Sequence, residues 1–246
     1  MGIRKVLKRY FIKFEHNLSK KLEVKDKKII ISGSNSGIGL ELAKNLAINN
    51  KVISLVNKNY DEINKFKNEN LSILQQDLEK DEFPESFVND IKGFKPNIII
   101  NCAGTFGPTK QNLIDLDIKN FNKVLNINLF SPLRISQYGY LGDDLHQVIN
   151  ITSEMGSISK NERGGFYYYR LSKTLLNSFS KNLHLELNQK NISVFCICPG
   201  SVKTKMNSAG LVPPEICAQK IINIISKNDK NLSGKFININ QELIQW

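Results

Sequence analysis

The sequence has few of the features that mark membrane-spanning or disulfide-stabilised proteins. Its longest apolar runs are about five residues, such as 194–198, whereas a transmembrane helix needs roughly 18 or more. Its four cysteines and three histidines, among 246 residues, show no spacing typical of a metal site or a redox pair. We therefore expect a soluble, cytoplasmic protein with no metal and no structural disulfide.

Acidic residues are too few to balance the basic ones, which gives a formal net charge of +11. Ten Lys and Arg against three acids lie within residues 1–28, so this segment alone carries +7 and the other 218 residues carry +4. No recognition-helix or base-stacking motif accompanies the excess. We therefore expect no nucleic-acid partner.

Residues 1–28 form a basic leader that differs from the rest of the chain. Its apolar side chains recur at helical spacing, and most of its basic side chains lie off that stripe. The stripe consists of Ile3, Val6, Leu7, Tyr10, Phe11, Phe14 and Leu18. The pattern predicts an amphipathic helix, which would make peripheral contact with an anionic membrane or pack against its own domain or a partner subunit.

Short β-branched runs alternate with longer helical patterns from residue 29 onwards. The expected strands are 28–32, 51–56, 71–74, 96–101, 147–152, 192–197 and 235–239, and the expected helices are 37–49, 60–67, 84–91, 113–138, 167–188 and 213–226. Most strands are continuous apolar runs, as strands buried on both faces are. The alternation predicts one α/β domain over 29–246, a Rossmann-like, doubly wound fold with a seven-stranded, mainly parallel sheet flanked by helices.

A Gly-rich turn follows the first expected strand and opens the first helix. Gly33 would allow the tight turn, Gly37 would let the backbone approach a pyrophosphate, and Gly39 would permit close packing. The unpaired N–H groups of the helix N-terminus would face the anion. The spacing is G-x3-G-x-G, so the turn alone is compatible with a nucleotide site or with a plain strand-to-helix connection.

Tyr169 and Lys173 are four residues apart within an expected helix and therefore lie on one face of it. An ammonium beside a phenol lowers the pKa of the phenol, which would make Tyr169 a general acid/base near neutral pH. A sequence of this composition holds roughly one such Tyr–Lys pair by chance. The pair therefore indicates a catalytic site only in combination with other motifs of the sequence.

Several further motifs accompany the Gly-rich turn and the Tyr–Lys pair in a fixed order. They are Asn101-Cys102-Ala103-Gly104, Asn128, Ser153, and the run from Pro199-Gly200 to Thr204. Together these motifs resemble the short-chain dehydrogenase/reductase family across about residues 29–246, with Ser32 and Cys102 as small departures. The stretches 156–170 and 234–246 are similar to the branch of C-factor and sniffer-type carbonyl reductases.

This resemblance implies an enzyme that interconverts a carbonyl and an alcohol with a nicotinamide cofactor. Tyr169 would be the general acid/base, and Ser153 would orient the same substrate oxygen. Lys173 would tune Tyr169 and hold the nicotinamide ribose. Asn128 would anchor a water that links Lys173 to solvent.

The resemblance also implies a set of cofactor-binding residues at the carboxyl ends of the strands. These are Gly33, Ser36, Gly37, Ile38, Gly39, Asn57, Lys58, Asp77, Leu78, Asn101, Ala103, Gly104, Tyr169, Lys173, Pro199, Gly200, Val202 and Thr204. Asp77 and Leu78 would contact the adenine, and Thr204 the nicotinamide amide. Asn101 equally fits a structural role in which it ties neighbouring strands together.

The choice between NADP and NAD depends on the end of the second expected strand. An acid there would bind the ribose 2′-hydroxyl of NAD, and residues 55–59 contain none. The Arg that selects NADP in relatives corresponds to Asn57, which leaves Lys58 as the available cation. We expect NADP, with NAD as the alternative.

A small-molecule carbonyl or alcohol is the expected substrate. The loop 201–213 is short and partly apolar, which is compatible with a modest apolar compound. A cofactor-binding signalling or regulatory protein with incidental turnover is the alternative function. By analogy with relatives, the helices at 113–138 and 167–188 would pack between subunits of a homodimer or homotetramer.

Overall fold

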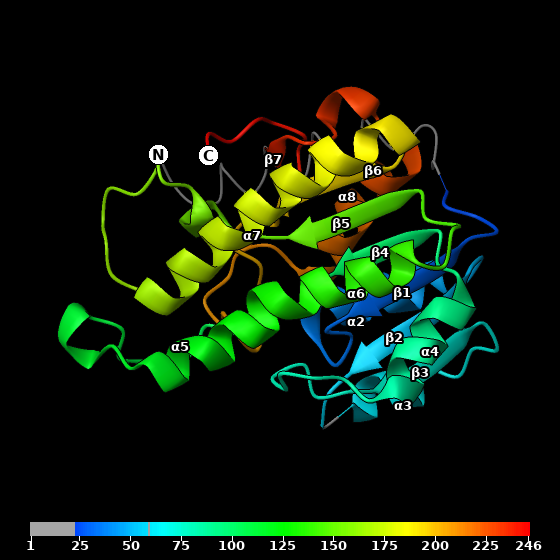
Figure 1. Cartoon of the computed structure of the whole chain (residues 1–246), viewed down its shortest axis with the longest axis horizontal. Helices are drawn as coiled ribbons and strands as arrows, with labels where there is room; N and C mark the ends of the chain where they lie inside the picture. The colour runs from blue at the N-terminus through cyan, green and yellow to red at the C-terminus, as the bar shows by residue number, and fades with distance from the viewer. Residues whose placement is uncertain (1–22, 59) are drawn as a thin grey trace.

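The computed structural model describes residues 23–58 and 60–246, which form one α/β domain around a seven-stranded sheet (Figure 1). The strand order is β3-β2-β1-β4-β5-β6-β7, and every neighbouring pair is parallel. The strands are β1 (Lys28–Ser32), β2 (Lys51–Val56), β3 (Leu71–Gln75), β4 (Ile98–Asn101), β5 (Gln147–Ile151), β6 (Ser193–Cys198) and β7 (Phe236–Asn238). The predicted Rossmann-like fold is confirmed.

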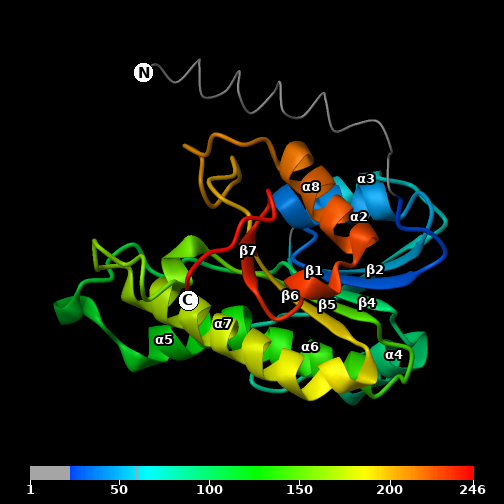
Figure 2. The same cartoon turned by 90° about the horizontal axis from the view of Figure 1, so that it is seen from above.

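Helices cover both faces of the sheet, as a parallel sheet with crossover connections requires. Figure 2 shows α2, α3 and α8 on one face and α4, α5, α6 and α7 on the other. Their bounds are α2 (Gly37–Leu46), α3 (Asp61–Lys65), α4 (Glu85–Phe94), α5 (Ile118–Leu125), α6 (Ser131–Tyr140), α7 (Tyr167–Leu187) and α8 (Pro214–Lys227). Short helical turns are η1 (Leu113–Asp115), η2 (Asn126–Phe130), η3 (Glu154–Gly156), η4 (Asn188–Lys190) and η5 (Lys230–Leu232).

The single helix predicted over 113–138 is wrong in one respect, because the structure divides this segment. A 3-10 turn, η1, precedes α5, and a π-helical turn, η2, joins α5 to α6. Asp117 is the N-cap residue of α5: its carboxylate accepts hydrogen bonds from the backbone N–H groups of Lys119 and Asn120, so a new helix begins here.

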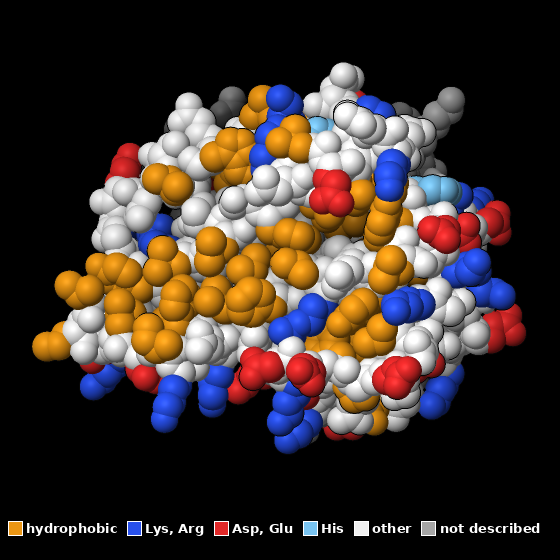
Figure 3. Space-filling model, in the orientation of Figure 1, with side chains coloured by type: hydrophobic (Ala, Val, Ile, Leu, Met, Phe, Trp, Pro, Cys, Tyr) orange, Lys and Arg blue, Asp and Glu red, His pale blue; other side chains and the backbone are white. Residues whose placement is uncertain are grey.

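The outer side of this helical layer is apolar. Figure 3 shows hydrophobic side chains gathered over η1, α5 and the first half of α7. The exposed apolar side chains on these three elements include Leu113, Ile114, Ile118, Leu171 and Leu175. An apolar patch of this kind often marks an interaction surface.

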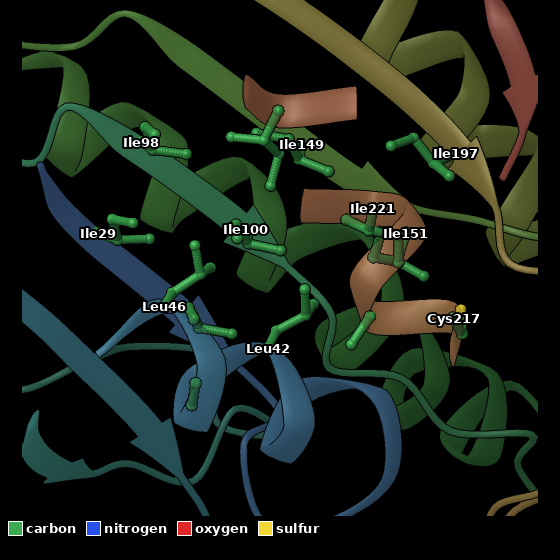
Figure 4. Packing of buried hydrophobic residues seen from close by; sticks show 14 of the residues in the cluster. Ile29, Leu42, Leu46, Ile98, Ile100, Ile149, Ile151, Ile197, Cys217 and Ile221 are labelled. Atoms are coloured by element: carbon green, nitrogen blue, oxygen red, sulfur yellow. The ribbon is translucent and has the colours of Figure 1, made fainter. Parts of the chain in front are cut away.

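Alternate residues of the central strands supply two separate cores, one on each face of the sheet. On one face Ile29, Ile100 and Ile149 pack against Leu42 of α2 and Ile221 of α8 (Figure 4). On the other face the neighbouring strand residues pack against α4, α6 and the end of α7, through Ile30, Ile99, Val148, Ile91, Ile135 and Leu187. Burial on both faces explains the continuous apolar runs in the sequence.

Residues 23–27 join the domain just before β1. Val24 is buried in the first of these cores, and its carbonyl accepts a hydrogen bond from Asn50. The apolar stripe of the predicted leader helix lies outside the described residues, so that helix and the boundary at residue 28 stay predictions. Within the described part of the chain, no helix is both long and apolar enough to span a bilayer.

Candidate active site

A cleft of about 320 Å³ opens at the carboxyl ends of the strands, where the strand order reverses between β1 and β4. Ser32 lies opposite Asn101 in the register of these two strands, which brings the Gly-rich turn against residues 102–104. Thirteen of the predicted residues line the cleft: Gly33, Ser36, Gly37, Ile38, Gly39, Asn57, Leu78, Ala103, Gly104, Tyr169, Lys173, Pro199 and Thr204.

The three glycines of the turn are needed for different reasons. Gly33 has φ +75°, and a Cβ there would lie 2.7 Å from the backbone of Ala103. A Cβ on Gly39 would overlap the carbonyl oxygen of Gly33 itself. Gly37 has φ +59°, and a Cβ there would lie 3.0 Å from the Cγ2 of Thr204. A larger residue at 33 or 39 would therefore force the backbone of the turn apart.

The N-terminus of α2 is suited to hold an anion. Ser36 occupies the N-cap position in an extended conformation, and within the described residues its side chain makes no capping hydrogen bond. The first turn of α2 contains no acidic residue. Unpaired N–H groups and the helix dipole therefore favour negative charge at this end of the cleft, as a dinucleotide pyrophosphate requires.

Tyr169 lies in the first turn of α7 and bonds to Ser153, which follows β5. The two side chains are hydrogen bonded, and Tyr169 is only 8% exposed. Burial raises the pKa of Tyr169 to about 12, and the bond to Ser153 opposes this rise. The rise is opposite to the lowering that the Tyr–Lys spacing alone predicts, because desolvation of the phenolate dominates.

Lys173 is buried one turn further along α7. Its Nζ donates to the carbonyl oxygen of Ile151 at 2.9 Å and lies 5.8 Å from the centroid of the Tyr169 ring. Burial lowers the pKa of Lys173 to about 8. Gly104 lies beside both side chains: a Cβ there would be in van der Waals contact with the Lys173 Nζ and the Asn128 Oδ1, 3.6 Å from each.

Asn128 lies in the π-helical turn η2 and is fully buried beside this group. Its Oδ1 accepts from the backbone N–H of Thr105 at 2.8 Å, and its Nδ2 donates to the carbonyl of Thr105 and to the Ser172 hydroxyl. The amide therefore holds the loop after β4 against α7. A water link from Asn128 to Lys173 stays a prediction.

Several predicted residues do not line the cleft. Besides Ser153 and Asn128, these are Lys58, Asp77, Asn101, Gly200 and Val202. Asn101 is buried, and its Nδ2 donates to Asn150 at 2.8 Å and to Ser136 at 3.2 Å, so it ties β4 to β5 and α6. For Asn101 the structure therefore supports the structural alternative.

The others shape the rim of the cleft or its supports. Lys58 is exposed, and its carbonyl accepts from Asn35 of the Gly-rich turn. Asp77 accepts from the side chain of Asn57 at 3.4 Å and from the backbone of Glu79. Val202 is buried and bridges to residue 212 within the loop after β6.

Some lining residues were not predicted. They are Asn35, Leu55, Cys102, Ile127, Ile151, Thr152, Lys205 and Met206. Most are direct neighbours of a motif residue in the sequence, so they could have been predicted from this adjacency. Leu55 and Ile151 carry no such signal, since they read as ordinary strand residues. Elsewhere in the described chain, no three His, Cys, Asp or Glu side chains converge as metal ligands would.

Comparison with known proteins agrees with this geometry. The family model described as short chain dehydrogenase matches residues 27–211. The chain is 29% identical over 161 residues to a 1-hydroxy-2-glutathionyl-2-methyl-3-butene dehydrogenase of Rhodococcus, which covers 63% of this chain and 70% of that one. It is 28% identical over 154 residues to the C-signal protein of Myxococcus xanthus, covering 61% and 92%.

Among solved structures, the carbonyl reductase Sniffer of Drosophila melanogaster is similar over nearly the whole fold. The TM-score is 0.81 at 25% sequence identity, and the match covers 91% of this chain and all of that one. The likeness to Sniffer and to the C-signal protein agrees with the resemblance suggested by residues 156–170 and 234–246.

Proposed function

This chain belongs to the short-chain dehydrogenase/reductase family, and from that premise we propose that it is an NADPH-dependent reductase of a small carbonyl compound. Family membership makes it an NAD(P)-dependent oxidoreductase that acts on a carbonyl or CH–OH group. The observation that carries the proposal is the hydrogen-bonded pair of Ser153 and Tyr169 with the buried Lys173 beside it.

A nicotinamide cofactor, when bound, would supply the hydride. The hydroxyls of Ser153 and Tyr169 are neighbours, so a substrate carbonyl oxygen placed beside them would accept a hydrogen bond from each. The phenol of Tyr169 is neutral at physiological pH, since its pKa is about 12, so it has a proton to give as negative charge develops on that oxygen. The ammonium of Lys173 stabilises the phenolate that remains.

The glycines of the turn and the N-terminus of α2 would hold the pyrophosphate. At the adenosine end, Leu55 and Leu78 offer apolar side chains that an adenine can contact. The cleft lining, as the described residues form it, contains Lys173 and Lys205 but no Asp or Glu. At the adenosine end, the exposed Lys58 at the rim is the cation that would contact the 2′-phosphate of NADPH.

The experiment that tests this function is calorimetric titration with NADPH and with NADH, followed by an assay of carbonyl-dependent NADPH oxidation. We expect tighter binding of NADPH and turnover with short-chain aldehydes. Binding of neither cofactor would contradict the proposal. Binding without turnover of any carbonyl would favour the second candidate.

That second candidate is a cofactor-binding signalling protein, which the likeness to the C-signal protein favours. In such a protein, nucleotide binding would control a partner contact and turnover would be incidental. The buried and bonded Tyr169 and Lys173 argue for catalysis, since burial of a lysine without a role costs stability.

We further propose that the apolar surface over η1, α5 and α7 is covered by a second copy of this chain in a homodimer or homotetramer. Leu171 and Leu175 lie one turn apart on α7 and are 46% and 42% exposed. Sedimentation velocity should show an oligomer that Leu171→Glu with Leu175→Glu dissociates. A monomeric wild-type protein would contradict this proposal.

A further inference from the structure

The ring of Phe106 lies flat against the ring of Tyr169. The centroids are 4.1 Å apart and the planes differ by 8°. Phe166 then meets Phe106 edge to face, with centroids 5.7 Å apart. We propose that Phe106, supported by Phe166, is a specificity-determining residue that limits the bulk a substrate can carry next to its reacting carbonyl.

This inference rests on the proposed function, in which a carbonyl oxygen meets the hydroxyl of Tyr169. One face of that phenol is covered by Phe106, and the whole residue is 8% exposed. Groups attached to the carbonyl carbon must then fit beside the Phe106 ring. A branched group at this position would collide with a wall that a linear chain can pass.

The backbone of Phe106 is held in register with Tyr169 by one buried side chain. Gln111 is 4% exposed, and its Nε2 donates to the carbonyl of Phe106 at 2.8 Å. Its Oε1 accepts from the backbone N–H of Tyr169 at 3.3 Å. Gln111 therefore connects the loop after β4 directly to the first turn of α7.

Both neighbours of Phe106 are also fixed. Asn128 bonds to the N–H and the carbonyl of Thr105, as described above. Gly107 has φ +79°, and a Cβ there would lie 2.7 Å from the Cγ2 of Val124. The loop therefore has little freedom to shift, and the ring of Phe106 can leave the phenol only by rotation of its own side chain.

The outer part of the wall is held less firmly. Phe166 is 48% exposed and adopts a left-handed conformation with φ +50°, which is strained for a residue with a side chain. Gly164 and Gly165 precede it with φ +60° and +66°, and a Cβ on either would meet no described atom within 4 Å. Phe166 can therefore yield to a substrate more readily than Phe106 can.

The test compares two aldehydes that differ in branching beside the carbonyl, propanal and pivaldehyde. The quantity measured is kcat/KM for pivaldehyde divided by kcat/KM for propanal, so that intrinsic reactivity cancels between variants. We expect Phe106→Ala to raise this ratio roughly tenfold or more over wild type, because the space beside the phenol of Tyr169 gains the volume of a ring. An unchanged ratio would overturn the proposal.

Phe121→Ala is the matched control. Among the described ring contacts, Phe121 meets Tyr168, the neighbour of Tyr169 on α7, with centroids 5.8 Å apart, whereas Phe106 stacks on Tyr169 itself. The control removes an aromatic ring of the same kind that packs against the same helix, α7. We expect its ratio to equal that of wild type; a rise as large as that of Phe106→Ala would mean general loosening of α7 and would also overturn the proposal.

A second measurement separates this inference from the proposed function. Nitration by tetranitromethane, quantified on the peptide that contains Tyr169, reports how well Phe106 shields the phenol whether or not any carbonyl is reduced. We expect faster nitration of Tyr169 in Phe106→Ala than in wild type or Phe121→Ala. If wild type reduces neither aldehyde, the proposed function fails, and an unchanged nitration rate would contradict the shielding independently.

Discussion

The catalytic end and the adenosine end of the cleft are built in different ways. At the catalytic end Tyr169 and Lys173 are buried, and each is bonded to a group at the end of β5. At the adenosine end Asn57 and Lys58 are exposed and are positioned by single polar contacts with Asn35 and Asp77. In the proposed function, buried groups therefore carry the chemistry, whereas exposed groups would select the cofactor.

The two ends should therefore respond differently to mutation. A buried polar group that loses its hydrogen-bond partner destabilises the fold, because no water can reach it to replace the lost bond. An exposed charge is screened, and its interactions are worth about 1 kcal/mol or less. Substitutions at the catalytic end should change rate or stability strongly, and those at the adenosine end should change only the preference between cofactors.

The largest effect is expected for Ser153→Ala. Loss of one donor to the developing negative charge should lower kcat roughly 100- to 1000-fold. The pKa of Tyr169 should rise further, because the bond from Ser153 lowers it. Steady-state kinetics would measure this, with Ser159→Ala as the control, since Ser159 bonds to the carbonyl of Trp246. Comparable rates in both variants would contradict the proposed role of Ser153.

The next effect concerns stability: Lys173→Met should raise the free energy of unfolding. Burial lowers the pKa of this lysine from 10.5 to about 8, so below pH 8 the folded state holds a charge it disfavours. Removing that charge should stabilise the fold by about 3 kcal/mol, less about 1 kcal/mol for the lost hydrogen bond to Ile151.

The stabilisation by Lys173→Met should depend on pH. The penalty is fully present below the folded pKa of about 8 and disappears as the pH rises toward 10.5, where the unfolded lysine also loses its proton. Urea unfolding at pH 7 and at pH 10 should show the advantage of the variant shrinking. An advantage that grows with pH would contradict the assigned pKa shift.

The smallest effects are expected at the rim. Lys58→Ala should weaken NADPH binding about threefold and leave NADH binding unchanged, because an exposed cation contributes little. Lys205 also lines the cleft and pairs with Glu62 at 3.3 Å, next to Thr204, which faces Gly37. Lys205→Ala should therefore weaken both cofactors equally. Calorimetric titration would decide, and a selective loss in Lys205→Ala would reverse the two assignments.

The same contrast explains what the sequence could predict. Strands buried on both faces are visible as apolar runs, and the need for glycine at 33 and 39 follows from the turn itself. The role of Asn101 could not be assigned from the sequence. Whether its side chain meets a cofactor or bonds to Asn150 depends on how β4 pairs with β5. Pairing is decided by the whole sheet.

Two features of the site were beyond local patterns for the same reason. The spacing of Tyr169 and Lys173 predicts their proximity but not the burial that raises the pKa of the phenol. Gln111 and Phe106 have no motif of their own, and only the packing of the loop after β4 on α7 gives them a role. Tertiary contacts between distant segments carry this information.

The most direct test of the central claim is Tyr169→Phe, measured for both turnover and cofactor affinity. Loss of the proton donor should lower kcat at least roughly 100-fold, as removal of a general acid does. Affinity for NADPH should stay within a few-fold, since the variant leaves the Gly-rich turn and the N-terminus of α2 unchanged. Unchanged turnover in Tyr169→Phe would contradict the claim that this buried phenol is the catalytic acid.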